Sequence, residues 1–394
     1  MKTSAFLYPW DVLGDPDAPA RVMDLGVRQV TLASAYHSTR ALTPRHPRHR
    51  VVTAEHSAVL YPIDEDRWAD AELRPYAAGE WAPGDAFGEA AAALAGAGLD
   101  VHTWVVLAHN SRLGAEHPDT SVVNVYGDRY PWAPCIARPA VRTYVLSLAA
   151  EAAVRPGAAG TELESLGWYG LAHLHAHDKI GGVPLGEAAQ YLMSLCFCTV
   201  CRAGYLSLGL DPDELNAAVR RALEPVWNGA QAPGGPPGPP GIEKLLGAEL
   251  TAATLDWRVN AARTLQETTV AAVRARGGPG FQVLLHADPH SHRTGANAGV
   301  DPAHILDAAD GVVLPCTGGA AEAMLTPFAA HRRESTVLAA NFTVVTGMGG
   351  SPGTLADDAA RARALGATEL RLYHAGLASD ADLAAVTAGL SRLG

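Results

Sequence analysis

The sequence predicts an α/β protein of the (β/α)8 TIM-barrel class with a helical insertion after the fourth strand. Eight apolar, strand-like runs alternate with Ala-rich helical stretches, and 394 residues that are 48% hydrophobic are enough for one large barrel. A third observation argues against an open doubly wound sheet. The segment after the first strand, Trp10-Asp-Val-Leu-Gly-Asp-Pro16, is not the glycine-rich phosphate turn that such sheets carry.

The expected strands are short apolar runs bounded by polar or turn-forming residues. We expect them at residues 4–10, 27–35, 99–107, 160–164, 281–287, 311–315, 336–345 and 369–374. The barrel helices are expected at residues 18–25, 86–97, 139–154, 302–309, 320–331, 355–365 and 379–393. Asp17 and Asp85 are the expected N-caps of the first two helices, and Gly26 and Gly98 their end signals.

The chain is expected to form a single barrel over residues 1–394, with the insertion at 184–276. Within the insertion we expect helices at 184–209, 212–223 and 242–276, the second of them capped by Asp211. Residues 230–241 are almost all Gly, Pro, Ala and Gln. Such a composition buries little apolar surface and predicts a mobile surface loop.

Charge and composition exclude several classes of partner. The formal net charge is -11 and is spread along the chain, which argues against nucleic acid and anionic membranes. No apolar run approaches the ~20 residues of a membrane helix. No signal-peptide core precedes Pro9 and Asp11, and five cysteines are an odd count for a secreted disulfide framework. We expect a cytoplasmic protein.

Barrel enzymes carry their sites at the C-terminal ends of the strands. Glu162 and Glu164 lie two residues apart near the end of the fourth strand, so their side chains share one face. We expect both to point inward, with Glu164 nearer the mouth. The alternative interpretation is a pair of salt-bridged carboxylates, and Arg371 in the eighth strand is the expected inward partner of Glu162.

A second carboxylate is expected on the neighbouring strand, where Asp288 follows the fifth apolar run. Adjacent strands are ~4.8 Å apart, so carboxylates at their tips could reach the ~5–9 Å separation that glycoside hydrolysis uses. Glu164 and Asp288 are therefore the first catalytic candidates. Asp11 and Glu162 stand behind them.

Aromatic and histidine side chains at strand ends suit stacking on and hydrogen bonding to a sugar, although singly they are common core residues. The expected substrate-binding residues are Trp10, His37, His109, Asn110, Trp168, His175, His177, His286 and Tyr373. Residues 37–50 are rich in Arg and His. They predict either a solvated surface loop or a lid over a polyhydroxy or anionic ligand.

Two rival functions stay open on the sequence. His173, His175 and His177 alternate at strand spacing, and with His286 they would suit a metal-dependent hydrolase. The same histidines would also line a polar substrate cleft. The third function is a carbohydrate-binding barrel without catalysis.

Cys196-Phe-Cys-Thr-Val-Cys201 contains a Cys-x-x-Cys pair. Cys196, Cys198 and Cys201 predict a structural zinc site if a histidine supplies a fourth ligand. The alternatives are a disulfide within the cluster and buried packing in a helix, and we expect packing for Cys135 and Cys316. Catalysis itself requires no cofactor in this interpretation.

Two segments resemble glycoside hydrolase-like barrel proteins of actinobacterial type. In these proteins a Cys-Pro-x-Asn-Pro-x-Val-Arg-like turn precedes the helix before strand four, as residues 130–142 do here with a departure at Ile136-Ala137. Strand four then ends in a Gly-x-x-Leu-acid pattern whose acid falls on Glu164. Residues 373–379 resemble the last barrel strand of such proteins.

The resemblance implies a (β/α)8 glycoside hydrolase with Glu164 as nucleophile or acid/base, acting on a small glycoside or an oligosaccharide. It leaves the sugar, the linkage and the partner acid open. The sequence contains no Gly-x-Ser-x-Gly elbow, Walker loop or His-Glu-x-x-His motif. This argues against the common classes of serine hydrolase, nucleotide-binding protein and zinc protease.

Overall fold

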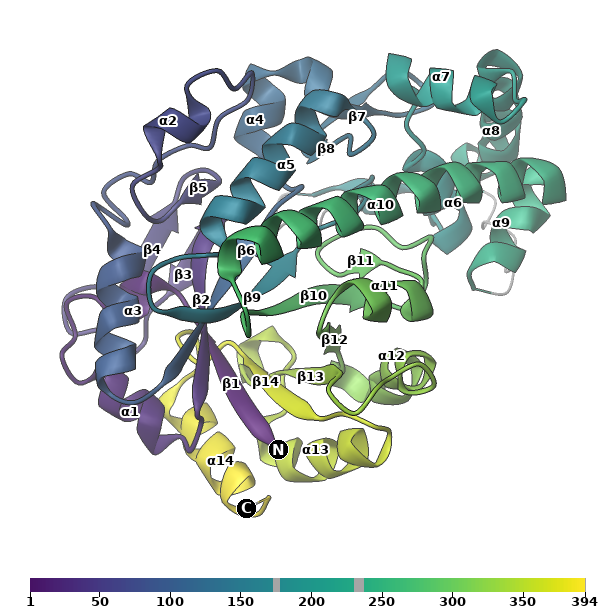
Figure 1. Ribbon diagram of the computed structural model, residues 1–394. Helices are drawn as coiled ribbons and strands as arrows, with labels where there is room; N and C mark the ends of the chain where they lie inside the picture. The colour runs from purple at the N-terminus through teal and green to yellow at the C-terminus, as the bar shows by residue number, and fades with distance from the viewer. Residues whose placement is uncertain (173–177, 230–236, 394) are drawn as a thin grey trace.

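The computed structural model describes residues 1–172, 178–229 and 237–393 (Figure 1). Eight parallel strands pair in a closed ring, because the first strand pairs with both the second and the last. The barrel strands are β1 (Lys2–Leu7), β2 (Gln29–Tyr36), β6 (Asp100–Val106), β9 (Ala158–Glu164), β10 (Gln282–Asp288), β12 (Gly311–Pro315), β13 (Val337–Thr343) and β14 (Glu369–Tyr373). The predicted fold class is confirmed.

Helices surround the strands in Figure 1 and follow each strand in turn. They are α1 (Ala18–Asp24), α3 (Ala86–Gly96), α5 (Pro139–Ala152), α10 (Ala248–Gly277), α11 (Pro302–Ala308), α12 (Ala321–Ala329), α13 (Leu355–Ala364) and α14 (Asp380–Ser391). Asp85 caps α3 through the backbone N–H of Gly88, as expected. Asp17 makes no side-chain cap bond, so that cap prediction is wrong.

Successive residues of each barrel strand point alternately outward, toward the helices, and inward, into the barrel. Outward-facing residues such as Leu163 are buried between the barrel and its helices. Inside the barrel, Leu284, Val313, Val337 and Ala339 form a small apolar cluster of their own. Polar side chains occupy the inward positions above this cluster, and these positions lead to the mouth.

The segments between β2 and α3 and between β6 and α5 contain regular structure that the sequence did not reveal. After β2 come the hairpin β3 (Thr39–Leu42) and β4 (Val51–Ala54), the short strand β5 (Ala58–Val59) and the helix α2 (Glu65–Trp68). After β6 come α4 (Ser111–Glu116) and the hairpin of β7 (Ser121–Val123) with β8 (Arg129–Pro134). These strands are too short for periodicity to identify them.

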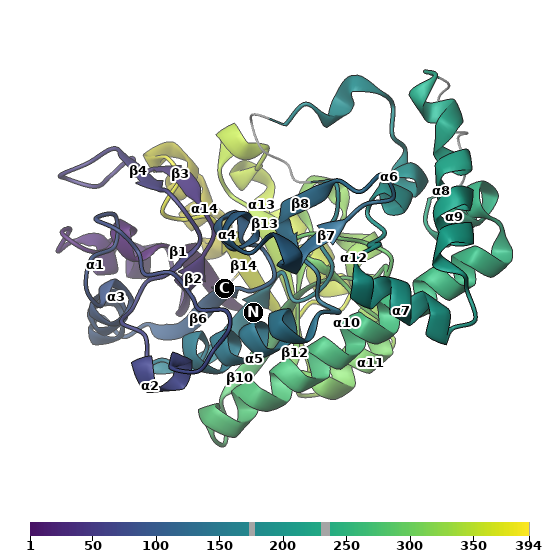
Figure 2. The same ribbon diagram turned by 90° about the horizontal axis from the view of Figure 1, so that it is seen from above.

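The connection from β9 to β10 carries α6 (Glu187–Met193), α7 (Thr199–Ser207), α8 (Pro212–Trp227) and α9 (Pro239–Leu246) before α10. Figure 2 shows α7, α8 and α9 at the opposite end of the molecule from the β3–β4 hairpin. Asp211 caps α8 as expected. The short strand β11 (Ala298–Gly299) pairs with the end of β10.

Two helix predictions in this connection were wrong. The helix expected at 184–209 is two helices, separated by a turn in which Phe197 N–H bonds to the carbonyl of Val123. The helix expected at 242–276 is interrupted at Gly247, whose φ of +85° suits glycine. Of the expected loop 230–241, residues 230–236 lie outside the described residues, and α9 already begins at Pro239.

Across the described ranges, no helix is both long and apolar enough to cross a membrane.

Candidate active site at the barrel mouth

The strand β9 carries both glutamates on its inward face, at successive levels of the barrel. Its register with β6 aligns Glu162 with Trp104 and Glu164 with Val106. Glu162 is fully buried, whereas Glu164 keeps 7% of its surface exposed. The expected order, with Glu164 nearer the mouth, therefore holds.

Glu162 takes part in a network of buried polar contacts inside the barrel. Its Oε1 is 2.5 Å from Nε of Arg371 and 3.1 Å from the donating hydroxyl of Thr31, while Oε2 is 3.4 Å from Nε2 of His286. Burial by itself raises the pKa of Glu162, but the charge of Arg371 and the His286 contact outweigh it and lower that pKa to about 2. The expected Glu162–Arg371 pair is present.

Arg371 joins a second carboxylate, because its Nη1 donates to Glu369 at 2.8 Å. His102 faces the same interior, and burial lowers its pKa to about 4 although Glu162 acts in the opposite direction. The guanidinium is thus paired with two carboxylates, although its Nη2 and Oε2 of Glu162 have no hydrogen-bond partner among the described residues. This geometry is typical of a fixed structural charge.

Glu164 has different surroundings. Its Oε2 accepts a hydrogen bond of 2.7 Å from the indole Nε1 of Trp104. The next residue, Ser165, has a φ of +60°, which is uncommon outside glycine and turns the chain sharply away from the strand. Glu164 is therefore the last residue of β9 and is held at the mouth by one indole donor.

Tyrosines surround the Glu164 carboxylate. Tyr8 donates its hydroxyl to Tyr36 at 3.1 Å, and Tyr373 packs edge-on against the ring of Trp104. Burial first and the charge of Glu164 second raise the pKa of Tyr169 and Tyr373, so both stay neutral phenols. Neutral hydroxyls beside a carboxylate are well suited to bind sugar hydroxyls.

Asp288 ends the neighbouring strand β10. The register aligns Leu285 with Leu163, which sets His286 beside Glu164 and Asp288 further toward solvent. The Asp288 side chain is 17% exposed, and its Oδ1 accepts bonds of 2.8 Å and 2.7 Å from the backbone N–H and Nδ1 of His290. Asp288 is thus a mouth carboxylate on the strand next to Glu164.

Asp11 belongs to a separate feature. Its Oδ2 accepts from Tyr8 N–H at 2.8 Å, and burial raises its pKa to about 7 against the effects of that bond and of Arg45. With Asp15 and Arg21 it lines a cavity of about 30 Å³ between α1 and α14, large enough for about one or two waters.

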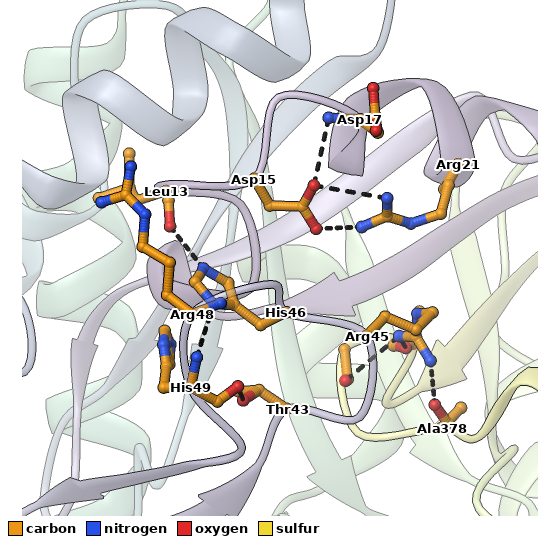
Figure 3. A network of polar contacts seen from close by, with 12 residues as sticks. Leu13, Asp15, Asp17, Arg21, Thr43, Arg45, His46, Arg48, His49 and Ala378 are labelled. Carbon is orange, nitrogen blue, oxygen red and sulfur yellow. Dashed lines mark hydrogen bonds and ion pairs between the residues drawn. The ribbon is translucent and has the colours of Figure 1, made fainter.

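The Arg- and His-rich segment beside this cavity is tied back onto the protein (Figure 3). Arg45 donates to the carbonyls of Ala375 and Ala378, and His46 contacts the carbonyl of Leu13 at 2.8 Å. These two side chains are engaged in backbone contacts. The geometry therefore favours a fixed loop over the lid that the sequence suggested.

Three of the expected substrate-binding residues lie among the aromatic rings near the mouth. Trp10 stacks on Tyr8 with ring centroids 4.5 Å apart, and His37 stacks on Tyr36 at 4.2 Å. His109 stacks on Tyr169 at 4.4 Å. Tyr373 is half-buried and packs against the ring of Trp104.

Other expected binding residues make internal contacts instead. Asn110 caps α4 by accepting from Leu113 N–H at 3.0 Å, and Trp168 donates to the carbonyl of Arg258 on α10 at 2.9 Å. His286 contacts Glu162 inside the barrel. His173, His175 and His177 lie outside the described residues, so the histidine-metal hypothesis is a prediction that the described geometry leaves open.

Asn341 is a mouth residue that sequence reasoning left out of the expected site. It pairs in register with Arg371, so it shares the inward face of β13. Its Oδ1 is buried and has no hydrogen-bond partner among the described residues. A buried acceptor without a donor is uncommon in native proteins and suits a ligand hydroxyl. The sequence places Asn341 near the end of a strand, and strand alternation is the signal that could have added it to the expected binding residues.

The cysteines form a cluster in the β6–α5 and β9–α10 connections. Cys196, Cys198 and Cys201 converge with Cys135, and the four Sγ atoms all lie within 4.8 Å of one another. The fourth thiol is therefore Cys135, where the sequence suggested a histidine and assigned Cys135 to packing. Within the described part of the chain, this is the group with metal-ligand spacing.

No protein-family model and no curated protein matches this sequence. Solved structures with the same fold include an α-L-fucosidase isoenzyme 2 from Paenibacillus thiaminolyticus, with a TM-score of 0.59, 12% identity and coverage of 100% of this chain and 49% of that chain. The glycoside hydrolase domain of PgaB (BpsB) from Bordetella bronchiseptica gives a TM-score of 0.57, with 15% identity and coverage of 98% of each chain. The β-amylase catalytic domain from Paenibacillus polymyxa gives 0.56, with 11% identity and coverage of 100% and 98%. The chain spans about half the length of the fucosidase.

Proposed function

We propose that the protein is a glycoside hydrolase, a hydrolase acting on O-glycosyl bonds, with Glu164 as its acid/base and Asp288 as the second carboxylate. The observation that carries the proposal is the position of Glu164 at the barrel mouth, bonded to Trp104 and surrounded by neutral tyrosine hydroxyls. Structures named as glycosidases share the fold, and this likeness of fold supports the glycoside hydrolase proposal.

The two carboxylates take different roles in this mechanism. Asp288 accepts two hydrogen bonds from His290, which stabilise it as an anion that attacks the anomeric carbon or activates a water. Glu164 gives its proton to the leaving oxygen as the glycosidic bond breaks, and recovers a proton from water. Tyr8, Tyr36 and Tyr373 position sugar hydroxyls between the two groups.

Glu162 is outside this reaction in the proposal. Its pairing with Arg371 and its burial make it a structural anion below the mouth, and Asp11 lies in the cavity beside α1. The substrate is a small glycoside or an oligosaccharide with at least one free hydroxyl face for the aromatic rings.

The test is a turnover screen on oligosaccharides and aryl glycosides with the wild type, Glu164→Gln and the exposed-residue control Glu322→Gln. General acid–base catalysis contributes about 10²- to 10⁴-fold, and we expect Glu164→Gln to lose that much on oligosaccharides while the control stays active. Full turnover of oligosaccharides by Glu164→Gln would sink the assignment. Glycan binding without turnover by the wild type would favour the non-catalytic barrel, and a bound metal that is lost on mutation of His175 or His177 would favour the metal-dependent hydrolase.

A further inference from the structure

Four thiols from two distant parts of the chain meet in one buried cluster. Cys135 directly follows β8, while Cys196, Cys198 and Cys201 lie in the turn between α6 and α7 and at the start of α7. The Sγ of Cys135 is 3.7 Å from Cys196, 3.7 Å from Cys198 and 3.6 Å from Cys201. The four side chains are at most 4% exposed.

These distances match a tetrahedral metal centre. A Zn–S bond is about 2.3 Å long, so the sulfurs at the corners of a zinc tetrahedron are about 3.8 Å apart. A disulfide instead brings two sulfurs to about 2.05 Å, and none of these three sulfur pairs approaches that length. A closed shell of four sulfurs with no oxygen or imidazole donor favours zinc in a structural role.

The backbone around the cluster supports anionic sulfur. The Sγ of Cys196 lies 3.5 Å from two donors, the N–H of Val123 and the N–H of Cys198. Such N–H groups orient ligating thiolates and offset their charge. Phe197 N–H bonds to the Val123 carbonyl at 2.7 Å, which fixes the turn against β7.

A buried cation lies near the same turn. Arg258 on α10 is 2% exposed, and its Nη1 donates to the carbonyl of Ser194 at the start of the turn. Its Nε and Nη2 have no hydrogen-bond acceptor within the described ranges. The guanidinium of Arg258 lies over the rings of Trp168 and Tyr191, 5.2 Å and 5.0 Å from their centroids. A buried guanidinium is costly without a negative neighbour, and a zinc tetrathiolate carries a net charge of -2.

We propose that Cys135, Cys196, Cys198 and Cys201 bind one Zn²⁺ in a closed, structural site. Each thiol releases its proton to solvent when its sulfur binds the metal. The bound ion links the β6–α5 connection to the β9–α10 connection. Those connections also meet through Tyr130, whose hydroxyl donates to Met193, and through Trp132, whose indole donates to Gly170. The zinc site therefore fixes one wall of the barrel mouth, independently of what the mouth binds.

The test is the metal content of the untagged full chain purified without chelators from zinc-supplemented cells. We expect about one zinc per chain in the wild type, and less than about a fifth of that in Cys135→Ser and Cys198→Ser. Cys316→Ser is the matched control, because Cys316 is also buried but lies outside the cluster. It should retain full zinc.

Two further measurements use the wild type alone, in case the serine variants do not fold. Replacement of zinc by Co²⁺ should give the intense visible bands of a tetrahedral thiolate site, and a strong chelator should expose four additional reactive thiols and lower the melting temperature. A folded, zinc-free wild type, a disulfide within the cluster, iron in place of zinc, or full zinc retention by Cys135→Ser would each overturn the proposal.

Discussion

Oε1 of Glu162 lies 2.5 Å from Nε of Arg371, and both side chains are shut off from solvent inside the barrel. Removing one partner of such a pair leaves a buried charge uncompensated. We therefore expect Arg371→Met to lower the free energy of unfolding by about 3–5 kcal/mol, because Glu162 and Glu369 lose their positively charged partner. Urea unfolding measures this loss.

The matched control is Arg333→Met, which breaks an exposed pair with Asp307. Exposed pairs contribute less than about 1 kcal/mol, so this variant should unfold almost as the wild type does. Equal losses in Arg371→Met and Arg333→Met would contradict the structural role of the interior pair.

His102 makes the free energy of unfolding depend on pH in the acidic range. Its pKa is lowered to about 4 in the folded protein and is about 6.5 in the unfolded chain. Between these values the unfolded chain binds more protons, so the free energy of unfolding falls as pH drops from 6.5 to 4, by up to about 3 kcal/mol from this group. His102→Gln should flatten that part of the stability curve, while the exposed-residue control His331→Gln should not. An unchanged slope in His102→Gln would refute the assignment.

Trp104 positions Glu164 through its indole N–H. Trp104→Phe keeps an aromatic ring but removes the donor, and a hydrogen bond to a charged group contributes about 1.5–3 kcal/mol. We expect kcat to fall about 10- to 100-fold with a much smaller change in KM. Trp227→Phe, at an exposed position, is the control. A rise in KM with kcat unchanged would instead assign Trp104 to substrate binding.

Oδ1 of Asn341 is an acceptor that no donor reaches within the described parts of the chain. Losing an unsatisfied buried acceptor costs little stability, so Asn341→Ala should keep the wild-type melting temperature or raise it slightly. If that acceptor binds a sugar hydroxyl, KM should rise about 10-fold at the same time. A drop in melting temperature with normal KM would make Asn341 a packing residue.

The sequence anticipated features that follow from local pattern. The βα alternation predicted the barrel, and strand periodicity placed Glu162, Glu164 and Arg371 on inward faces, from which the Glu162–Arg371 pair followed. These inferences need only the chain's own periodicity and the closure of eight strands.

Features that depend on distant contacts were missed. Cys135 and Cys196 are 61 positions apart in the sequence, and no local pattern links them. The indole of Trp104 reaches Glu164 from another strand, and the Arg45 contacts with Ala375 and Ala378 join opposite ends of the chain. The short hairpins also form only where the barrel supports them.

The role of Glu164 as proton donor is tested most directly by the leaving-group dependence of Glu164→Gln on a series of aryl glycosides. A dinitrophenolate leaves without protonation, whereas an alkoxide requires it. We predict that the variant keeps near-normal kcat/KM on dinitrophenyl glycosides and loses about 10²- to 10⁴-fold on poor leaving groups. Wild-type rates across the whole series would contradict the central claim that Glu164 is the catalytic acid at the mouth of this barrel.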